Sequence, residues 1–224
     1  MAGLWDSGSG KITRPSTAEM FFLPQRPYCT LGTLRDQLHY PKKPPSNSSS
    51  PTSGIIGSSG HGLSDLAQEN EELLSILEAV NLGDLPLRMG NGSAVDGLDV
   101  MTDWSGILSL GEQQRLAFGR LLYNKPKLAI LDEATSALDL NSERKMYEVL
   151  QAIPGISYVS VGHRPSLVDF HDSKLFLSGN GYTLEPLPSL LEGREEVRES
   201  SSSSNSGMGS KGRKAEAGGG GGRV

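Results

Sequence analysis

Apolar residues along the chain fall into two kinds of segment. Short continuous runs at 128–131 and 157–161 are typical of strands that are covered on both faces of a sheet. Longer segments show helical spacing instead, most clearly at 66–80, where glutamates separate the apolar positions. One face of that segment carries Leu66, Leu73, Leu77 and Val80. The pattern therefore predicts buried strands separated by amphipathic helices.

Local start and stop signals predict the remaining elements. Thr33 has the side chain of an N-cap and opens a short helix, and Pro24 ends the strand that precedes it. We expect strands at 19–23, 128–131 and 157–161, helices at 66–80, 111–123 and 141–153, and a hairpin of 174–178 with 182–187 around Gly179-Asn180-Gly181. Strands that alternate with helices indicate an α/β domain with a largely parallel sheet.

Two stretches of biased composition interrupt this pattern. Residues 41–62 are rich in Pro, Ser and Gly and are interpreted as a surface insertion. Residues 188–224 have few apolar side chains, so we expect a disordered tail that cannot offset its ordering entropy. Residues 1–187 are then the single structured domain. We interpret both stretches as solvated spacers, with phosphoserine regulation as the alternative.

Composition narrows the classes of function. A net charge of −5 gives no basic surface for nucleic acid, which we exclude as a partner. The single cysteine, Cys29, allows no intrachain disulfide and fits a reducing compartment. No apolar run reaches the roughly 20 residues that a membrane helix needs. We therefore expect any link to a membrane to run through another polypeptide or another segment.

The strongest chemical signal is a pair of carboxylates at the end of a predicted strand. Asp132 and Glu133 follow the run 128–131, which suits Mg-nucleotide chemistry. One acid can hold magnesium, and the other can orient or deprotonate a water. Upstream, Ser109 and Gly111 open a predicted helix, whose unpaired N–H groups favour a phosphate. The alternative interpretation of Ser109 is that its side chain only caps the predicted helix and binds no phosphate.

Five short motifs, taken in order along the chain, resemble those of ABC transporter ATPase domains. They are the Q-loop glutamine Gln25, the signature motif at 108–115, the Walker B strand at 128–133, the D-loop at 136–139 and the switch histidine His163. The resemblance covers roughly residues 1–187. It implies a P-loop NTPase-like ABC ATPase domain of the α/β class, with a largely parallel sheet and a helical signature subdomain.

The finer resemblance is to subfamily D, which includes peroxisomal and plastid half-transporters, and to its bacterial relatives. It rests on the stretches 22–28, 111–115 and 163–167. Leu110 stands where the common signature has glycine, a departure that recurs in the bacterial and plastid branch. The resemblance implies transport of fatty acyl or other hydrophobic substrates at a peroxisomal, plastid or bacterial inner membrane.

The resemblance also implies roles for individual residues. Asp132 and Gln25 would contact Mg²⁺, Glu133 would be the general base, and His163 would hold the γ-phosphate of ATP. Asp139 would link the two nucleotide sites of a head-to-tail dimer with a second ABC nucleotide-binding domain, and a transmembrane domain would complete the transporter. The signature residues would contact the nucleotide held by that second domain: Ser109, Leu110, Gly111, Glu112 and Gln113.

An ABC ATPase also needs a glycine-rich loop, Walker A, that ends in Gly-Lys-Ser/Thr and cradles the phosphates. The segment 8–13 imitates it, but Trp5 stands at the place of the first glycine and Ile12 at the place of the hydroxyl. We therefore expect the true loop and its strand to precede this sequence, which would then be a fragment. That strand is expected to pair beside 128–131, so we expect the chain alone to be unstable.

Three functions are compatible with these residues. The first is the energy-coupling ATPase domain of a half-transporter. The second is a non-hydrolysing module that supplies its signature motif to an intact partner domain. The third, a soluble ABC protein of translation or DNA repair, is disfavoured because such proteins carry paired domains or long coiled coils. Genomic sequence before Met1 that encodes a glycine-rich loop and membrane helices would favour the first function.

We predict that the 224-residue chain by itself binds Mg-ATP weakly or not at all. The glycine-rich loop supplies most of the backbone N–H contacts to the phosphates, together with the lysine that neutralises them. Isothermal titration with Mg-ATP measures this directly. A dissociation constant in the low micromolar range would contradict the prediction.

Overall fold

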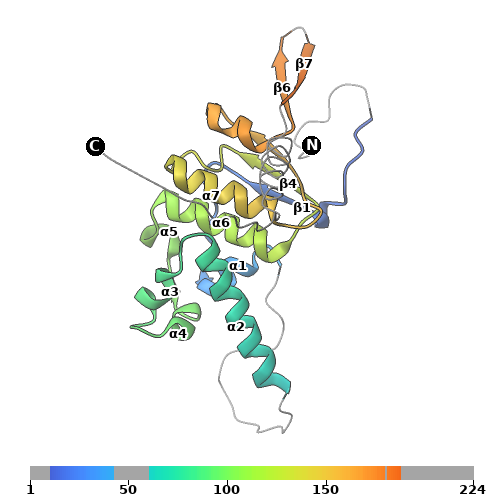
Figure 1. The fold of residues 1–224 in the computed structure, drawn as a ribbon. Helices are drawn as coiled ribbons and strands as arrows, with labels where there is room; N and C mark the ends of the chain where they lie inside the picture. Colours follow the sequence, from blue (N-terminus) through green and yellow to red (C-terminus); the bar gives the residue numbers. More distant parts are fainter. Residues whose placement is uncertain (1–10, 43–60, 180, 188–224) are drawn as a thin grey trace, which may run out of the picture. The chain divides into compact units, whose positions relative to one another are not determined.

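The computed structural model describes residues 11–42, 61–179 and 181–187. The chain divides into two compact units, Met1–Arg164 and Pro165–Val224. Figure 1 labels the helices and strands along the chain. Three expectations from the sequence fall largely or wholly outside the described residues: the imitation loop before Lys11, most of the insertion 41–62, and the tail 188–224.

A three-stranded parallel sheet lies at the centre of the first unit. It consists of β1 (Met20–Leu23), β4 (Leu128–Asp132) and β5 (Ser157–Val161), in the order β1-β4-β5. The two registers pair Leu23 with Leu131 and Asp132 with Val161. β4 pairs with β1 along one edge and with β5 along the other. The expectation that a strand from upstream of this sequence pairs beside β4 is therefore wrong. The expected instability of the chain alone rested on an unpaired edge of β4, so the structure removes the reason for that expectation.

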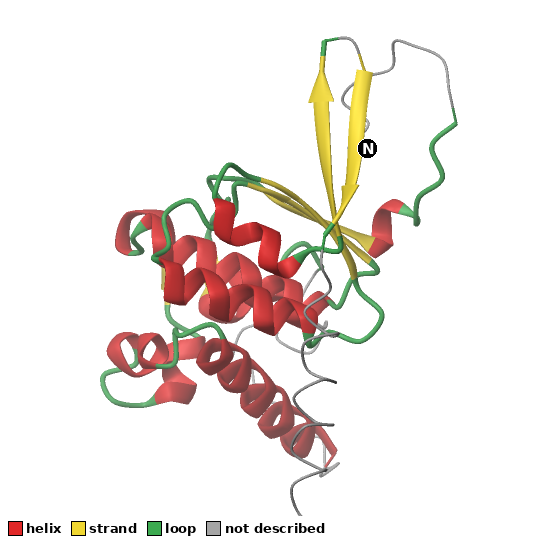
Figure 2. Ribbon diagram, turned by 45° about the horizontal axis from the view of Figure 1, so that its top comes forward, coloured by secondary structure: helices red, strands yellow, loops and turns green. Residues whose placement is uncertain are grey.

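The sheet buries one face within the described residues. Phe21, Leu23, Ala129 and Leu131 are buried, since side chains alternate between the faces of a strand. The helices α6 (Leu110–Asn124) and α7 (Leu140–Gln151) pack together, and α6 packs against β1 (Figure 2). On the other face Phe22 is 44% exposed and Val161 is 56% exposed. The expectation that both faces are covered is therefore wrong for 157–161, whereas Leu128 and Ile130 of the run 128–131 are half-buried on this face.

The helical part of the first unit lies in sequence between β1 and α6. Its elements are β2 (Gly32–Thr33), α1 (Leu34–His39), α2 (His61–Ala79), α3 (Asp84–Met89), α4 (Ala94–Leu98), β3 (Met101–Thr102) and α5 (Trp104–Ile107). The prediction that Thr33 caps a helix is confirmed, because its hydroxyl accepts from the Asp36 N–H. α2 begins at His61 and so includes the last two residues of the expected insertion 41–62.

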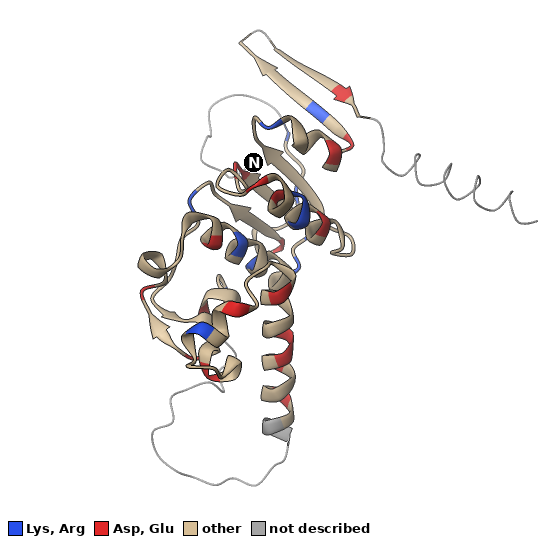
Figure 3. Cartoon of the chain, turned by 60° about the vertical axis from the view of Figure 1, so that its left-hand side comes forward, with Lys and Arg blue, Asp and Glu red and all other residues tan. Residues whose placement is uncertain are grey.

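The core of this helical part is built around α2 and a buried tryptophan. Leu73, Leu77 and Val80 are fully buried, whereas Leu66 at the start of the predicted face is 45% exposed. Acidic residues follow the length of α2 in Figure 3. Trp104 is also buried, and its Nε1 donates to the Gly32 carbonyl at 2.9 Å.

The second unit contains a 3₁₀ helix, η2 (Pro165–Phe170), and a hairpin. The hairpin joins β6 (Ser173–Ser178) to β7 (Gly181–Pro186), antiparallel, with Ser178 paired to Gly181. This confirms the predicted hairpin and its turn position. Gly181 has φ +151°, a conformation that a side chain rarely tolerates, which explains glycine there. No helix in the described part of the chain is long and apolar enough to cross a membrane.

The two ends of the predicted apolar face of α2 provide a stability test. We predict that Leu77→Ala lowers the free energy of unfolding by about 2–5 kcal/mol, because it leaves a cavity at a fully buried position. Leu66→Ala is the matched control, and its half-exposed side chain predicts a change within about 0.5 kcal/mol. Urea unfolding followed by circular dichroism measures both. Equal losses would show that the helix buries its whole apolar face.

Candidate functional site

Three side chains from distant parts of the sequence meet at the carboxyl edge of the sheet. Gln25 follows β1, Glu133 follows β4 and His163 follows β5. Gln25 Nε2 donates to Glu133 Oε2 at 2.7 Å, and His163 Nδ1 lies 3.3 Å from Glu133 Oε1. Parallel strands end at one edge, where α/β proteins bind their ligands. The structure thus brings together three of the residues that the sequence singled out.

The backbone of Glu133 is unusual. Its φ of +46° lies in the left-handed region, which non-glycine residues seldom adopt. Its N–H donates to the Val161 carbonyl at 2.9 Å, which extends the pairing of β4 with β5 by one residue. Strained backbone at a residue with a chemical side chain is a recurrent feature of functional sites. The strain therefore supports a functional assignment for Glu133.

Asp132 and Gln25 supply oxygen atoms of the kind that Mg²⁺ prefers. Asp132 is the last residue of β4 and is exposed, next in sequence to Glu133. Among the described residues, no group of three or more His, Cys, Asp or Glu could hold a metal on its own. Mg²⁺ is usually bound through one or two carboxylates together with waters and substrate phosphates. When bound, the ion would neutralise charge on the phosphates.

The signature segment forms the N-terminus of α6. Ser109 is its N-cap: its hydroxyl accepts from the Glu112 N–H at 3.3 Å. Glu112 Oε2 in turn accepts from the Ser109 N–H at 2.9 Å and from its hydroxyl at 2.8 Å. Arg88 of α3 contacts Glu112 Oε1 at 3.1 Å. This arrangement is a capping box. In the chain by itself, Ser109 therefore acts as the N-cap of α6.

The contacts of the Glu112 carboxyl group lower its pKa. Burial by itself raises the pKa of the carboxyl, but hydrogen bonds from the Ser109 N–H, the Ser109 hydroxyl and Arg88 outweigh burial. The net result is a pKa below the ordinary value of a glutamate. Glu112 therefore stays ionised and keeps the first turn of α6 ordered.

The remaining signature residues have contacts of their own. Leu110 is exposed. A Cβ at Gly111 would lie 3.3 Å from the Ala137 carbonyl, so the absence of a side chain lets α6 approach the loop after β4. Gln113 Nε2 donates to the Leu108 carbonyl at 2.9 Å. Within the described residues, no hydrogen bond links 109–113 to Gln25, Glu133 or His163. Their predicted contact with a partner's nucleotide stays a prediction.

Asp139 is the N-cap of α7. Its Oδ1 accepts from the N–H groups of Asn141 and Ser142 at 3.0 Å each, and its Oδ2 accepts from the Ser142 hydroxyl at 2.7 Å. Hydrogen bonds from the backbone and then the hydroxyl of Ser142 lower the pKa of the carboxyl. On its own chain the residue therefore begins a helix. Its predicted link between two nucleotide sites stays a prediction.

Gln114 is a site residue that sequence reasoning missed. It is fully buried, and its Nε2 donates to the Gln25 carbonyl at 2.9 Å and to the Ser136 hydroxyl at 3.1 Å. Its Oε1 accepts from the Ala137 N–H at 3.0 Å. One side chain of α6 thus ties the backbone at residue 25 to the loop after β4. The available signal was a glutamine on the buried side of the predicted helix 111–123.

Comparison with known proteins agrees with this geometry. A family model described as ABC transporter matches residues 67–136. An uncharacterized ABC transporter ATP-binding protein of Synechocystis is 46% identical over 81% of this chain and 23% of that protein. ABC transporter D family member 2, chloroplastic, of Arabidopsis thaliana is 43% identical over 80% of this chain and 28% of that protein.

A human relative and a solved structure extend the comparison. Human ATP-binding cassette sub-family D member 3 is 39% identical over 80% of this chain and 24% of its own length. The structure of a bacterial Atm1-family ABC exporter with ATP bound superposes with a TM-score of 0.53 at 21% identity, over 84% of this chain and 29% of that one. At that identity the likeness shows the fold.

The fold and the matches define the class: residues 67–136 match the ABC transporter family, and the chain has the fold of an ABC ATPase domain. Within that class, its relatives are subfamily D transporters and a cyanobacterial ATP-binding protein. The chain spans about a quarter of the length of these curated relatives.

The buried position of Gln114 leads to a second stability test. We predict that Gln114→Leu lowers the free energy of unfolding by at least about 2 kcal/mol, because the Gln25 carbonyl and the Ala137 N–H lose their partner. Gln113→Leu is the matched control on the same helix. The Gln113 side chain is only half-buried, and one of its two bonds, to the Ser105 carbonyl, is exposed, so its expected cost is below about 1 kcal/mol. Chemical unfolding of both variants checks the difference, and equal costs would show that Gln114 adds nothing beyond its helix.

Proposed function

We propose that this chain supplies the hydrolytic residues of an ATP site in an ABC transporter, and that this hydrolysis is coupled to transport. The observation that carries the proposal is the convergence of Gln25 and His163 on the two oxygens of Glu133. Two residues on separate strand ends orient one carboxylate at the sheet edge where α/β proteins bind nucleotides. That is the arrangement a general base requires, since proton transfer depends on geometry before pKa.

Each residue has a distinct part in the proposed reaction. Glu133 takes the proton of the attacking water. A carboxylate accepts about four hydrogen bonds, so Glu133 can hold a water while the bond from Gln25 remains. His163 donates to the transferred γ-phosphate of ATP. Asp132 and the Gln25 amide oxygen would hold Mg²⁺, which would neutralise charge on the phosphates, while the Gln25 amide N–H donates to Glu133.

The proposed assembly is a head-to-tail dimer with a second ABC ATP-binding domain, attached to a transmembrane domain. Ser109 and Gly111 lie at the exposed N-terminus of α6, which can meet a phosphate held by the second domain. The relatives are membrane transporters, and the name of the Arabidopsis thaliana relative places that protein in chloroplasts. We propose a peroxisomal, plastid or bacterial inner membrane and a fatty acyl or similar hydrophobic substrate.

A second candidate function is a non-hydrolysing module that offers its signature segment to an intact partner. The observation that favours it is the order of the N-terminus of α6, where the capping box of Ser109 and Glu112 is complete within this chain. In this case Glu133 would not act on ATP. The partner domain would supply the phosphate loop and the base.

Two mixed dimers distinguish these functions. In the first, a glycine-rich phosphate loop and its strand are joined ahead of this chain to complete its site, and the partner domain has its own catalytic glutamate replaced, so that any hydrolysis comes from the site built on Glu133. We predict that Glu133→Gln in this chain then lowers steady-state ATP hydrolysis on the order of 10²–10⁴-fold, the usual worth of a general base. Glu148→Gln on the exposed side of α7 is the control and should leave the rate unchanged.

In the second dimer the partner domain is intact, and Ser109→Arg is introduced in this chain. We expect hydrolysis at the partner's site to stop, because bulk and positive charge would occupy the helix N-terminus that faces the phosphate. If the first dimer shows no hydrolysis while the second depends on Ser109, the signature-module function holds. A second dimer unaffected by Ser109→Arg would contradict the head-to-tail arrangement.

A further inference from the structure

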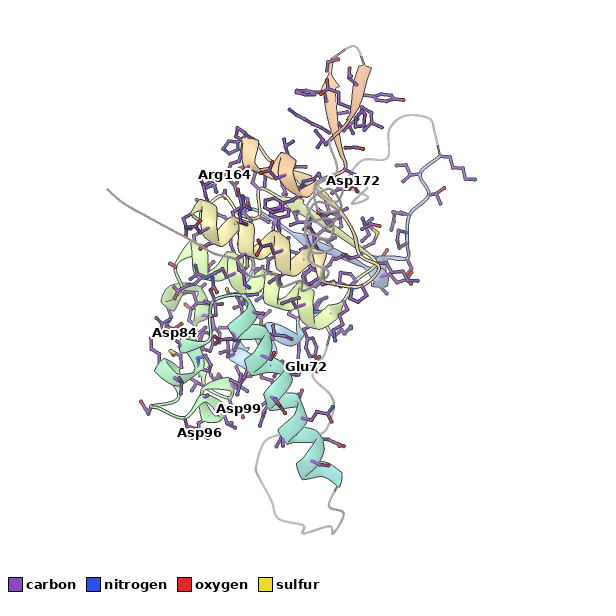
Figure 4. All side chains as sticks on the ribbon, viewed as in Figure 1. Glu72, Asp84, Asp96, Asp99, Arg164 and Asp172 are labelled. Atoms are coloured by element: carbon purple, nitrogen blue, oxygen red, sulfur yellow. The ribbon has the colours of Figure 1, made fainter. Side chains whose placement is uncertain are left out.

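Arg164 follows His163 directly in the sequence and turns its guanidinium onto the loop after β4, residues 133–139 (Figure 4). Nη1 donates to the Leu138 carbonyl at 2.8 Å, and Nη2 donates to the Ser136 carbonyl at 2.9 Å. The side chain is 26% exposed. A planar, forked donor can hold two carbonyls of one loop in a fixed relation, which a lysine cannot do.

The same guanidinium pairs with a buried carboxylate. Arg164 Nη1 lies 3.1 Å from Oε2 of Glu143, whose side chain is 1% exposed in the first turn of α7. Glu143 Oε2 also accepts from the hydroxyl of Thr135, a buried residue of the loop, at 2.7 Å. Glu143 therefore contacts the loop, through Thr135, and Arg164 at the same time. The Arg164–Glu143–Thr135 group is a clamp on residues 133–139.

The clamped loop connects two site residues. It begins at Glu133, and its internal bonds run from the Ser136 N–H to the Glu133 carbonyl at 3.0 Å and from the Leu138 N–H to the Thr135 carbonyl at 3.0 Å. It ends at Asp139, the N-cap of α7. Because Arg164 is bonded to this loop and is adjacent to His163, the clamp limits how far His163 can move from Glu133.

We propose that Arg164 is a positioning residue: it holds the 133–139 loop against the segment that carries His163, and so fixes the Glu133–His163 arrangement that hydrolysis requires. The inference rests on the proposed function of Glu133 as the base. The competing explanation is that Arg164 only compensates the buried charge of Glu143. The two explanations differ in what happens when both charges are removed together.

The test uses Arg164→Met, Glu143→Gln and the double variant in the full chain. Arg164→Met removes the guanidinium that pairs with the buried Glu143 carboxylate, and we expect the melting temperature to fall by about 10 °C. The double variant removes that charge and should recover most of the loss. Amide hydrogen exchange of residues 136–138 should nevertheless remain about tenfold or more faster than in the unchanged chain, because the bonds to the two carbonyls are still missing. Peptides from 73–79 of α2 are the internal control.

The kinetic measurement uses the dimer in which only the site built on Glu133 can hydrolyse ATP. We expect the double variant to lower kcat on the order of 10–100-fold, with KM for ATP changed less than about threefold. Arg164→Lys keeps the charge beside Glu143 but loses the fork, so it should lower kcat while keeping the melting temperature.

Recovery of exchange, kcat and melting temperature together in the double variant would overturn the proposal, since charge compensation would then explain Arg164. Unchanged exchange at 136–138 in the double variant would overturn it as well. If Glu133→Gln leaves hydrolysis unaffected in the same dimer, the proposed function has failed instead, and the exchange measurement still decides whether Arg164 holds the loop.

Discussion

The pairing of β4 with β1 on one edge and β5 on the other is the constraint on which the site depends. Gln25 and Glu133 are 108 residues apart, and Glu133 and His163 are 30 apart, so only the sheet brings them to one place. All three strands run in the same direction, and the residues that follow them emerge together. A shift of the strand register by one residue would turn these side chains to the other face of the sheet.

The N-terminus of α6 shows how one set of groups can serve two purposes. In the chain alone, Glu112 satisfies the Ser109 N–H and hydroxyl. These are the same groups that the resemblance assigns to a phosphate on a partner domain. An incoming phosphate would therefore compete with the Glu112 carboxylate, and Arg88 is placed to hold that carboxylate aside through its other oxygen. The cap keeps the helix start ordered until a ligand replaces it.

Much of the fold could be predicted from the sequence, because periodicity and capping are local properties. The cap at Thr33, the helix at 66–80 and the hairpin around residue 180 follow from such signals. The short helices α3 to α5 could not be predicted, since segments of four to six residues do not show a helical period. The prediction that 157–161 is buried on both faces was wrong for a related reason: apolar content does not reveal which face other elements cover.

The candidate site was predictable to the extent that its residues belong to recognisable motifs. Gln25, Glu133 and His163 were found in that way, and the structure brings them together. Gln114 and Arg164 lie within the stretches 108–115 and 163–167 but were not singled out as site residues, because the loop carbonyls that they contact cannot be identified from the sequence. Long-range bonds from side chain to backbone have to be read from coordinates.

The left-handed backbone of Glu133 has a consequence for how this position would respond to selection. Glycine would relax the conformation, whereas any other side chain must bear its strain. A screen that rewards only heat resistance would therefore favour glycine at 133, and a screen that rewards ATP turnover would keep glutamate. If Glu133 is the base that we propose, folding and catalysis make opposed demands on this position.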